Sequence, residues 1–265
     1  MTTPTANQLH YLKNRLRYER RIRFLRIFLA IGFFLLWETA ARADWIDSFF
    51  FSSPGRIVTT FLSMVKDGSI FLHIGITLSE TLLSFLLVVV FGLAISLILW
   101  FFESASKVME PYLVILNSLP KSALAPLLIV WLGASFRTII VAGMSVAIFG
   151  TILNLYTGFA ETGKDKIKLI YTLHGTKKDA LLKVVLPSTI PMIISIMKVN
   201  IGLCLVGVVI GEFIGARNGL GYLIIYGSQV FKLDLVIMSI IILCMMAMLL
   251  YGSVTLVENY YFKKK

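Results

Sequence analysis

Apolar stretches long enough to cross a lipid bilayer recur along the chain, with short polar segments between them. A transmembrane helix needs roughly 20 predominantly apolar residues, and six stretches approach or exceed that length. They cover about residues 24–41, a part of 73–102, 108–132, 138–159, 188–214 and 233–257. This pattern predicts an all-α integral membrane protein with six transmembrane helices in each subunit.

Two of these stretches have features that a simple membrane helix lacks. The stretch at 73–102 would form a helix of about 45 Å, longer than the ~30 Å hydrocarbon layer, so we expect it to tilt or to extend into water. The stretch at 108–132 contains Pro120 and Pro126, which lack the amide hydrogen that a helix interior needs. The third span is therefore expected to be interrupted there.

A short amphipathic helix is predicted between the first two spans. Ser53 is a favourable N-cap, and Pro54 is suited to the first helical turn. Four apolar residues then share one face at helical spacing, and they are Ile57, Phe61, Met64 and Val65. We expect this helix to lie along the membrane surface.

The segment YTLHGTKKDALLKVVLPSTIP, residues 171–191, is basic although apolar stretches flank it on both sides. Thr176 is a candidate N-cap, and Pro187 is placed to begin the fifth span. The pattern predicts two short helices, 166–173 and 177–186, that meet at a His174–Gly175 corner. A solvated basic loop is the alternative, but the amphipathic faces favour a docking site for a cytoplasmic partner.

Composition and charge place the protein in the membrane and give it an orientation. Of the 265 residues, 58% are hydrophobic and only 15% are charged, whereas a soluble domain has about 25% charged residues. The net charge of +11 comes mainly from segments that flank the spans, at 13–26, 164–183 and 263–265. Positive flanks mark the cytoplasmic side, so both termini and the basic segment are predicted to be cytoplasmic. This distribution does not indicate nucleic acid as a partner.

The residue types that bind metals or catalyse reactions are scattered. His10, His73 and His174 are far apart in sequence, and Cys204 and Cys244 each lie inside an apolar stretch. We therefore predict no metal site, no disulfide and no catalytic residues.

Several motifs resemble a known family. The segment around 171–187 is similar to the coupling loop of permease subunits in ATP-binding-cassette (ABC) importers, with Thr172-Leu173 and Leu186-Pro187 at the family's positions. SSPGRIV, LNSLPKSALAPLLIVWLG and GEFIGARNGLGYLI resemble the nitrate/sulfonate/taurine/bicarbonate branch of this family. Departures from the pattern are Lys168-Leu169-Ile170 in place of Glu-Ala-Ala, His174 in place of Gly, and Glu80 where Arg is usual.

The resemblance implies a type I ABC importer-like permease, in a prokaryotic cytoplasmic membrane, with a cytoplasmic coupling helix. It implies a homodimer with the substrate path at the interface, two cytoplasmic ATP-binding subunits and an extracytoplasmic substrate-binding protein. This chain has no G-x-x-x-x-G-K-[ST] motif, so ATP and Mg would be bound by the partner subunits and the chain itself is not an enzyme. The domains are then 1–23, a basic cytoplasmic segment; 24–258, a single permease domain with its coupling loop at about 160–187; and 259–265, a basic tail.

The candidate site residues fall into four groups. ATPase coupling is assigned to Thr172, Leu173, His174, Gly175, Thr176, Lys177, Lys178 and Asp179. Polar residues within spans are costly and commonly line a path, and these candidates are Asn117, Lys121, Asn154, Lys198, Asn200 and Glu212. Close packing of helices near the dimer axis is assigned to Gly207 and Gly211. The external gate candidates are Arg217, Asn218, Gly219 and Gly221.

Alternatives remain open for several of these assignments. An interhelical ion pair or hydrogen bond would also explain the charged residues within spans, and for Lys121 and Glu212 the two interpretations are level. The cargo is expected to be a sulfonate-like or other small anion, and the alternative is a neutral or aromatic vitamin precursor. Less favoured classes are a membrane scaffold, a channel and a membrane enzyme.

Overall fold

The computed structural model describes residues 6–263, and this range is helical without strands. Residues 1–5 and 264–265, parts of the predicted terminal segments, lie outside the described residues. The helices are α1 (Ala6–Arg42), α2 (Ser48–Phe51), α3 (Pro54–Lys66), α4 (Ser69–Phe101), α5 (Glu103–Ser118), α6 (Lys121–Leu132), α7 (Phe136–Glu161), α8 (Lys164–Thr172), α9 (Lys177–Ala180), a π-helical turn (Leu181–Val185), α10 (Leu186–Gly215), α11 (Leu220–Gln229) and α12 (Leu233–Lys263).

The predicted membrane spans are present. Within residues 6–263, five helices are long and apolar enough to cross a bilayer, and the pair α5–α6 makes a sixth span if it is counted as one. That pair is bent by 96° at a short break, which contains Pro120 as the sequence predicts. The break follows from proline chemistry, because a proline cannot continue the hydrogen-bond ladder of a straight helix. Pro126, in contrast, lies inside α6.

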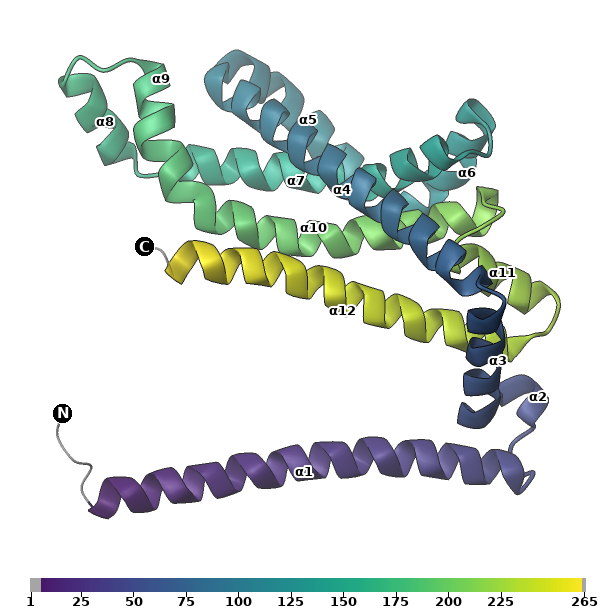
Figure 1. Ribbon diagram of the computed structural model, residues 1–265. Helices are drawn as coiled ribbons and strands as arrows, with labels where there is room; N and C mark the ends of the chain where they lie inside the picture. The colour runs from purple at the N-terminus through teal and green to yellow at the C-terminus, as the bar shows by residue number, and fades with distance from the viewer. Residues whose placement is uncertain (1–5, 264–265) are drawn as a thin grey trace.

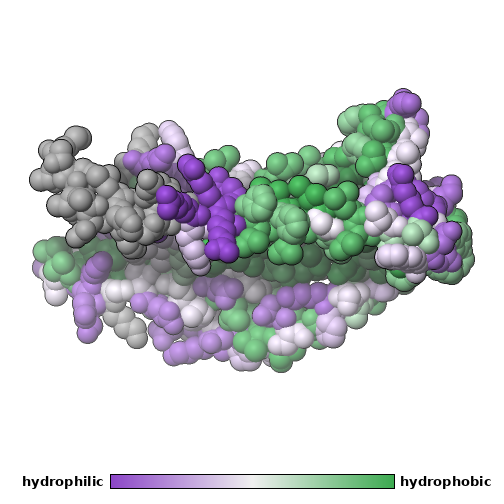
Figure 2. All heavy atoms as spheres, turned by 90° about the horizontal axis from the view of Figure 1, so that it is seen from below, coloured by the Kyte–Doolittle hydropathy of each residue, from purple (hydrophilic) through white to green (hydrophobic). Residues whose placement is uncertain are grey.

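The helices form a bundle from which α1 stands apart (Figure 1). α7 and α10 pack along their length, and α4 crosses both of them obliquely, while α12 lies beside α10. α1 contacts the rest of the chain mainly at one end, through α2 and α3, and its span is almost wholly exposed. Figure 2, in which α1 is nearest, shows an apolar band on it between hydrophilic ends. This band is suited to contact with lipid.

The two ends of the bundle differ in the elements that they carry. The first residues of α1 and the last residues of α12 lie at the end where α8 and α9 lie, and α2, α3 and α11 lie at the opposite end (Figure 1). This arrangement agrees with an even number of spans. The α8–α9 end is called the inner end below, and the α3–α11 end is called the outer end.

Small residues bring α4 and α7 into close contact. The Ser84 hydroxyl donates to the carbonyl oxygen of Ile140 at 2.9 Å, and the Ser96 hydroxyl reaches the carbonyl oxygen of Ile152 at 3.2 Å. Phe85, also on α4, packs against all three hydrophobic clusters of the bundle. Interhelical hydrogen bonds and small residues of this kind hold membrane helices together where lipid removes the hydrophobic driving force.

The glycine face of α10 packs inside the subunit, whereas the prediction placed this close packing near the dimer axis. An ideal Cβ on Gly207 would lie 2.8 Å from the Cα of Gly143, and one on Gly211 would lie 3.5 Å from the Cα of Ile139. Both neighbours belong to α7. Gly207 and Gly211 therefore serve close helix packing, as predicted, but their partner is α7 of the same chain.

The outer end carries the predicted amphipathic helix α3. The Ser53 hydroxyl accepts from the amide of Arg56, and Pro54 begins the helix, as predicted. The predicted apolar face of α3 packs against a core cluster of α4, α10, α11 and α12, so it contacts protein and not lipid. Arg56 pairs with Asp234 of α12 at 2.9 Å and fastens α3 to that helix.

Candidate functional site

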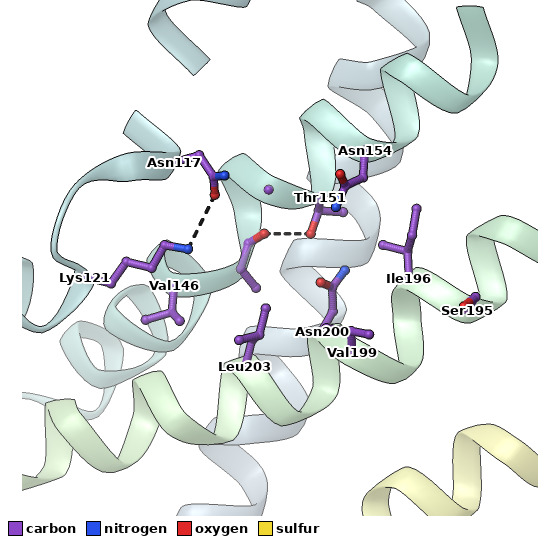
Figure 3. A pocket seen from close by; sticks show the side chains of 12 residues that line it. Asn117, Lys121, Val146, Thr151, Asn154, Ser195, Ile196, Val199, Asn200 and Leu203 are labelled. Carbon is purple, nitrogen blue, oxygen red and sulfur yellow. Dashed lines mark hydrogen bonds between the residues drawn. The ribbon is translucent and has the colours of Figure 1, made fainter. Parts of the chain in front are cut away.

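A polar cavity of about 270 Å³, called the central cavity below, lies between α5, α6, α7 and α10 and is open on the side of the exposed residues Asn154 and Val199. Four of the six predicted path residues line it: Asn117 at the end of α5, Lys121 at the start of α6, Asn154 on α7 and Asn200 on α10. Figure 3 shows them around one space. The break between α5 and α6 makes this possible, because it turns both Asn117 and Lys121 toward α7.

The polar groups of this cavity are only partly paired. The Lys121 ammonium lies 3.4 Å from the Asn117 carbonyl oxygen. Asn200 is 3% exposed, and its amide nitrogen makes no hydrogen bond within the described chain. A buried donor without a partner costs free energy, so the cavity offers unfilled hydrogen-bonding capacity. Amide groups and one ammonium can bind oxygen atoms of a solute or of water.

Lys198 and Glu212, the other two predicted path residues, do not line this cavity. Lys198 pairs with Glu258 of α12, and its ammonium lies 5.8 Å from the centre of the Tyr251 ring. The structure thus places Lys198 in an interhelical ion pair, which was the alternative that the sequence left open.

Glu212 lies at the outer end and holds the start of α11. Its carboxylate accepts from the hydroxyl of Thr77 and from the amide of Gly221, each at 2.6 Å. Thr77 in turn accepts from the amide of Leu220 at 2.8 Å, and His73 Nδ1 accepts from the amide of Gly219 at 3.0 Å. Side chains of α4 and α10 therefore satisfy three amides of the first turn of α11, which have no partner inside their own helix.

The predicted gate residues lie around these hydrogen bonds at the start of α11. Gly219 has φ of +112°, a conformation that favours glycine. A side chain at Gly219 or Gly221 would collide with the Glu212 carboxylate. Arg217 and Asn218 line a second cavity, of about 290 Å³, together with Glu80. The four gate candidates are thus close together, next to Glu212.

Glu80 occupies a position that the family resemblance left without a role. It is 1% exposed, and its carboxyl lies within hydrogen-bonding reach of Glu212. One of its oxygens has no partner in the described chain. Glu80 therefore extends the polar cluster of α4 toward the second cavity.

The corner of the predicted coupling loop is formed by His174 and not by Gly175. His174 has φ of +59°, whereas Gly175 has an ordinary negative-φ conformation. The amide of His174 donates to Tyr171 at 3.0 Å and that of Gly175 to Ile170 at 2.8 Å, the pattern that closes a helix with a left-handed residue. Gly175 is required for another reason, because an ideal Cβ there would lie 2.8 Å from the Ile170 carbonyl oxygen.

The N-cap predicted at Thr176 is present and is reinforced by Asp179. The Thr176 hydroxyl accepts from the amide of Asp179 at 3.3 Å, and the Asp179 carboxylate accepts from the amide of Thr176 at 2.9 Å. Lys183 pairs with Asp179 at 2.9 Å. This reciprocal capping fixes the start of α9.

Pro187 lies in the first turn of α10, as predicted, but no break in the helical backbone precedes it. Helical backbone continues from Lys177 to Gly215, and the turn at Leu181–Val185 is π-helical. A π turn just before Pro187 widens the helix where the proline ring would otherwise crowd the preceding turn. The coupling segment and the fifth span therefore form one continuous element.

The remaining coupling candidates differ in what they contact. Thr172 and Leu173 end α8, and Leu173 is 70% exposed. Lys178 is exposed and makes no ion pair within residues 6–263. Lys177 reaches across to α4, where its ammonium donates to the carbonyl oxygen of Phe101 at 2.8 Å.

Sequence reasoning missed three kinds of site residue. His73 and Thr77, with Glu80 and Ser84, form a buried polar stripe on the otherwise apolar α4. Their spacing of three to four residues was a readable signal for one helix face. Trp100 and Phe101, which contact Lys177, and Glu258, which pairs with Lys198, gave no such signal because their partners are distant in sequence.

The chain is similar in sequence to a known family of transport proteins. The family of binding-protein-dependent transport system inner membrane components matches residues 88–262. A probable ABC transporter permease protein of Haemophilus influenzae is 31% identical over 235 residues, which cover 88% of this chain and 95% of that protein. The formylaminopyrimidine transport permease protein ThiX of Halalkalibacterium halodurans is 28% identical, covering 85% and 89%.

The taurine transport system permease protein TauC of Escherichia coli is 22% identical over 221 residues, which cover 81% of this chain and 80% of that protein. The substrates named for ThiX and TauC differ, whereas all three relatives are named as permeases. The chain belongs to the binding-protein-dependent transport system inner membrane components, as a multi-pass permease of the ABC importers.

Proposed function

We propose that this permease forms the translocation path for a small anion and couples it to cytoplasmic ATPase subunits. The observation that carries the proposal is the central cavity, in which Asn117, Asn154 and Asn200 present amides and Lys121 presents an ammonium. A cation and neutral donors in a membrane interior favour an anionic solute over a cationic one.

The lining of the cavity also bears on the class of cargo. The described residues that line it include no carboxylate and no aromatic side chain. A carboxylate would repel an anion, and an aromatic ring is the usual surface on which a flat heterocycle stacks. We therefore favour a sulfonate-like or other small anion, as named for the taurine relative, over a heterocycle such as that named for ThiX.

The proposal includes partners and an orientation. The inner end, with α8, α9 and both termini, would face the cytoplasm, because the basic flanks gather there. Two ATP-binding subunits would dock on that end and bind ATP and Mg. A second copy of the chain would complete the path, and an extracytoplasmic binding protein would deliver the cargo to the outer end.

The test is uptake by proteoliposomes that contain the permease, its ATPase subunits and its binding protein. Labelled taurine, which carries a sulfonate group, is compared with nitrate and formylaminopyrimidine, and ATP-driven uptake of taurine or nitrate is the expected result. Asn117→Leu and Asn154→Leu should each lower uptake, while Asn259→Leu, at an exposed site on α12, should not. Uptake of the heterocycle alone would overturn the substrate class, and normal uptake by both cavity variants would overturn the path.

A further inference from the structure

We propose that Lys177 is a positioning residue, through which the coupling helix holds the junction between α4 and α5. The inference deepens the proposed coupling function and rests on it. Lys177 and Lys178 are adjacent in sequence, yet only Lys178 has a free ammonium on the surface. Lys177 is half-buried and its ammonium contacts α4. It is therefore unavailable as a charge for a partner.

The contact of Lys177 with α4 is made of three interactions. The ammonium donates to the carbonyl oxygen of Phe101 at 2.8 Å, and it lies 5.5 Å from the ring centres of both Trp100 and Phe101. Phe101 is the last residue of α4, so its carbonyl has no partner inside the helix and carries part of the negative end of the helix dipole. A cation that caps a helix end and also faces aromatic rings is favourably placed for both reasons.

The position of this contact gives it a mechanical meaning. A single residue, Phe102, separates α4 from α5 and serves as the end of one helix and the cap of the other. α5 then runs about 24 Å at 1.5 Å per residue to its end at Ser118. Asn117, in its last turn, lines the central cavity. A displacement of α9 can therefore be transmitted to the cavity by two routes. One runs through Lys177, the α4–α5 junction and α5, and the other runs directly along α10.

The electrostatic surroundings agree with a fixed ammonium. The Glu103 carboxylate at the start of α5 is close enough to interact with Lys177, and Thr176 and Asp179 fix the helical turn from which Lys177 extends. Lys178, one residue later, is exposed and makes none of these contacts within the described residues. The two lysines thus form a matched pair, in which one contacts the junction and its neighbour does not.

The first measurement is hydrogen exchange of the full-length protein, followed by mass spectrometry. In Lys177→Met, amides in peptides covering residues 95–108 should exchange about tenfold faster, because the hydrogen bond from a charged donor is lost at the junction. Lys178→Met should leave these peptides unchanged, and Lys177→Arg should restore protection. Equal exchange in the Lys177→Met variant and the wild type would overturn the contact.

The second measurement is uptake per ATP hydrolysed in the reconstituted complex. Lys177→Met should lower this ratio about tenfold with the ATPase subunits still bound, as expected for the loss of one charged hydrogen bond from the moving path. Lys178→Met should keep the wild-type ratio, and Lys177→Arg should recover it. A normal ratio in Lys177→Met, or loss of the ATPase subunits from it, would overturn the positioning role. Absence of ATP-driven uptake in the wild type would overturn the proposed function instead, and hydrogen exchange would still decide the contact.

Discussion

Gly207 of α10 lies directly against Gly143 of α7, so closely that a methyl group on Gly207 would be 2.8 Å from the Gly143 Cα. Backbone cannot move aside as the end of a flexible side chain can. Gly202, on the same helix, is exposed and has open space around the position of a Cβ. The two glycines therefore form a test and a control on one helix.

We expect Gly207→Ala to destabilise the subunit by about 1–3 kcal/mol, the usual cost of overpacking a close contact. Gly202→Ala should leave stability near that of the wild type. Thermal unfolding in detergent, followed by tryptophan fluorescence, measures both variants. A Gly207→Ala variant that unfolds at the wild-type temperature but has lost its dimer would return this glycine to the dimer interface.

Thr77→Val should loosen the start of α11. The hydroxyl of Thr77 donates to Glu212 and accepts from the amide of Leu220. Its removal leaves the Leu220 amide without a partner, at about 1–3 kcal/mol, and takes one of several hydrogen bonds from Glu212. Thr81→Val is the matched control, because the Thr81 hydroxyl bonds only within its own helix, to the carbonyl of Thr77. Proteolysis of the turn at residues 216–219 should become faster in Thr77→Val alone. Equal rates of proteolysis in the two variants would contradict the role of Thr77 in holding the first turn of α11.

The corner between α8 and α9 should respond to changes in shape in a defined way. His174→Gly should be tolerated or slightly stabilising. The left-handed conformation of His174 is strained by about 1–2 kcal/mol, and glycine would relieve this strain. Part of the stabilisation is offset because glycine has more conformational freedom in the unfolded chain. Gly175→Val should be harmful, since its side chain would meet the carbonyl oxygen of Ile170. ATP-driven uptake and thermal unfolding measure both. Loss of uptake or stability in His174→Gly, together with normal behaviour of Gly175→Val, would contradict the assignment of the left-handed residue to His174 and of the close backbone contact to Gly175.

The ion pair between Lys198 and Glu258 gives a fourth test. Glu258→Gln should destabilise the protein, because it leaves the Lys198 ammonium without its partner. Breaking a fully buried ion pair costs about 3–5 kcal/mol, and we expect a smaller loss here because both side chains are partly exposed. Lys198→Met combined with Glu258→Met should recover most of this loss. The double variant should also transport normally, because Lys198 does not line the central cavity. Stable double-variant protein without uptake would return Lys198 to the path.

The sequence was sufficient for the spans, because twenty apolar residues in a row leave few other structures possible. It was also sufficient for the caps at Ser53 and Thr176, which depend on neighbours only three residues away. The sequence also accounts for the placement of Asn117 and Lys121 in one cavity, because Pro120, which lies at the break between them, is visible in the chain. Local chemistry determined each of these features.

Features that depend on distant partners could not be predicted. Glu212 and Thr77 are separated by 135 positions, and Lys177 and Phe101 by 76. A glycine face on α10 predicts a close neighbour but not which helix supplies it, so α7 could not be distinguished from a second copy of the chain. The same limit applies to Lys198, for which the sequence leaves both a path role and an interhelical ion pair open.

The continuous helix from Lys177 to Gly215 has 39 residues, a length of about 58 Å at 1.5 Å per residue. One end contacts the α4–α5 junction, and the other carries Glu212 under the first turn of α11. Because the helix is continuous, a shift in the preferred position at one end alters the free energy of the contacts at the other end. Under the proposed function, thermodynamic reciprocity requires that a loaded binding protein at the outer end favours ATP-bound partners at the inner end by the same factor with which those partners favour the binding protein.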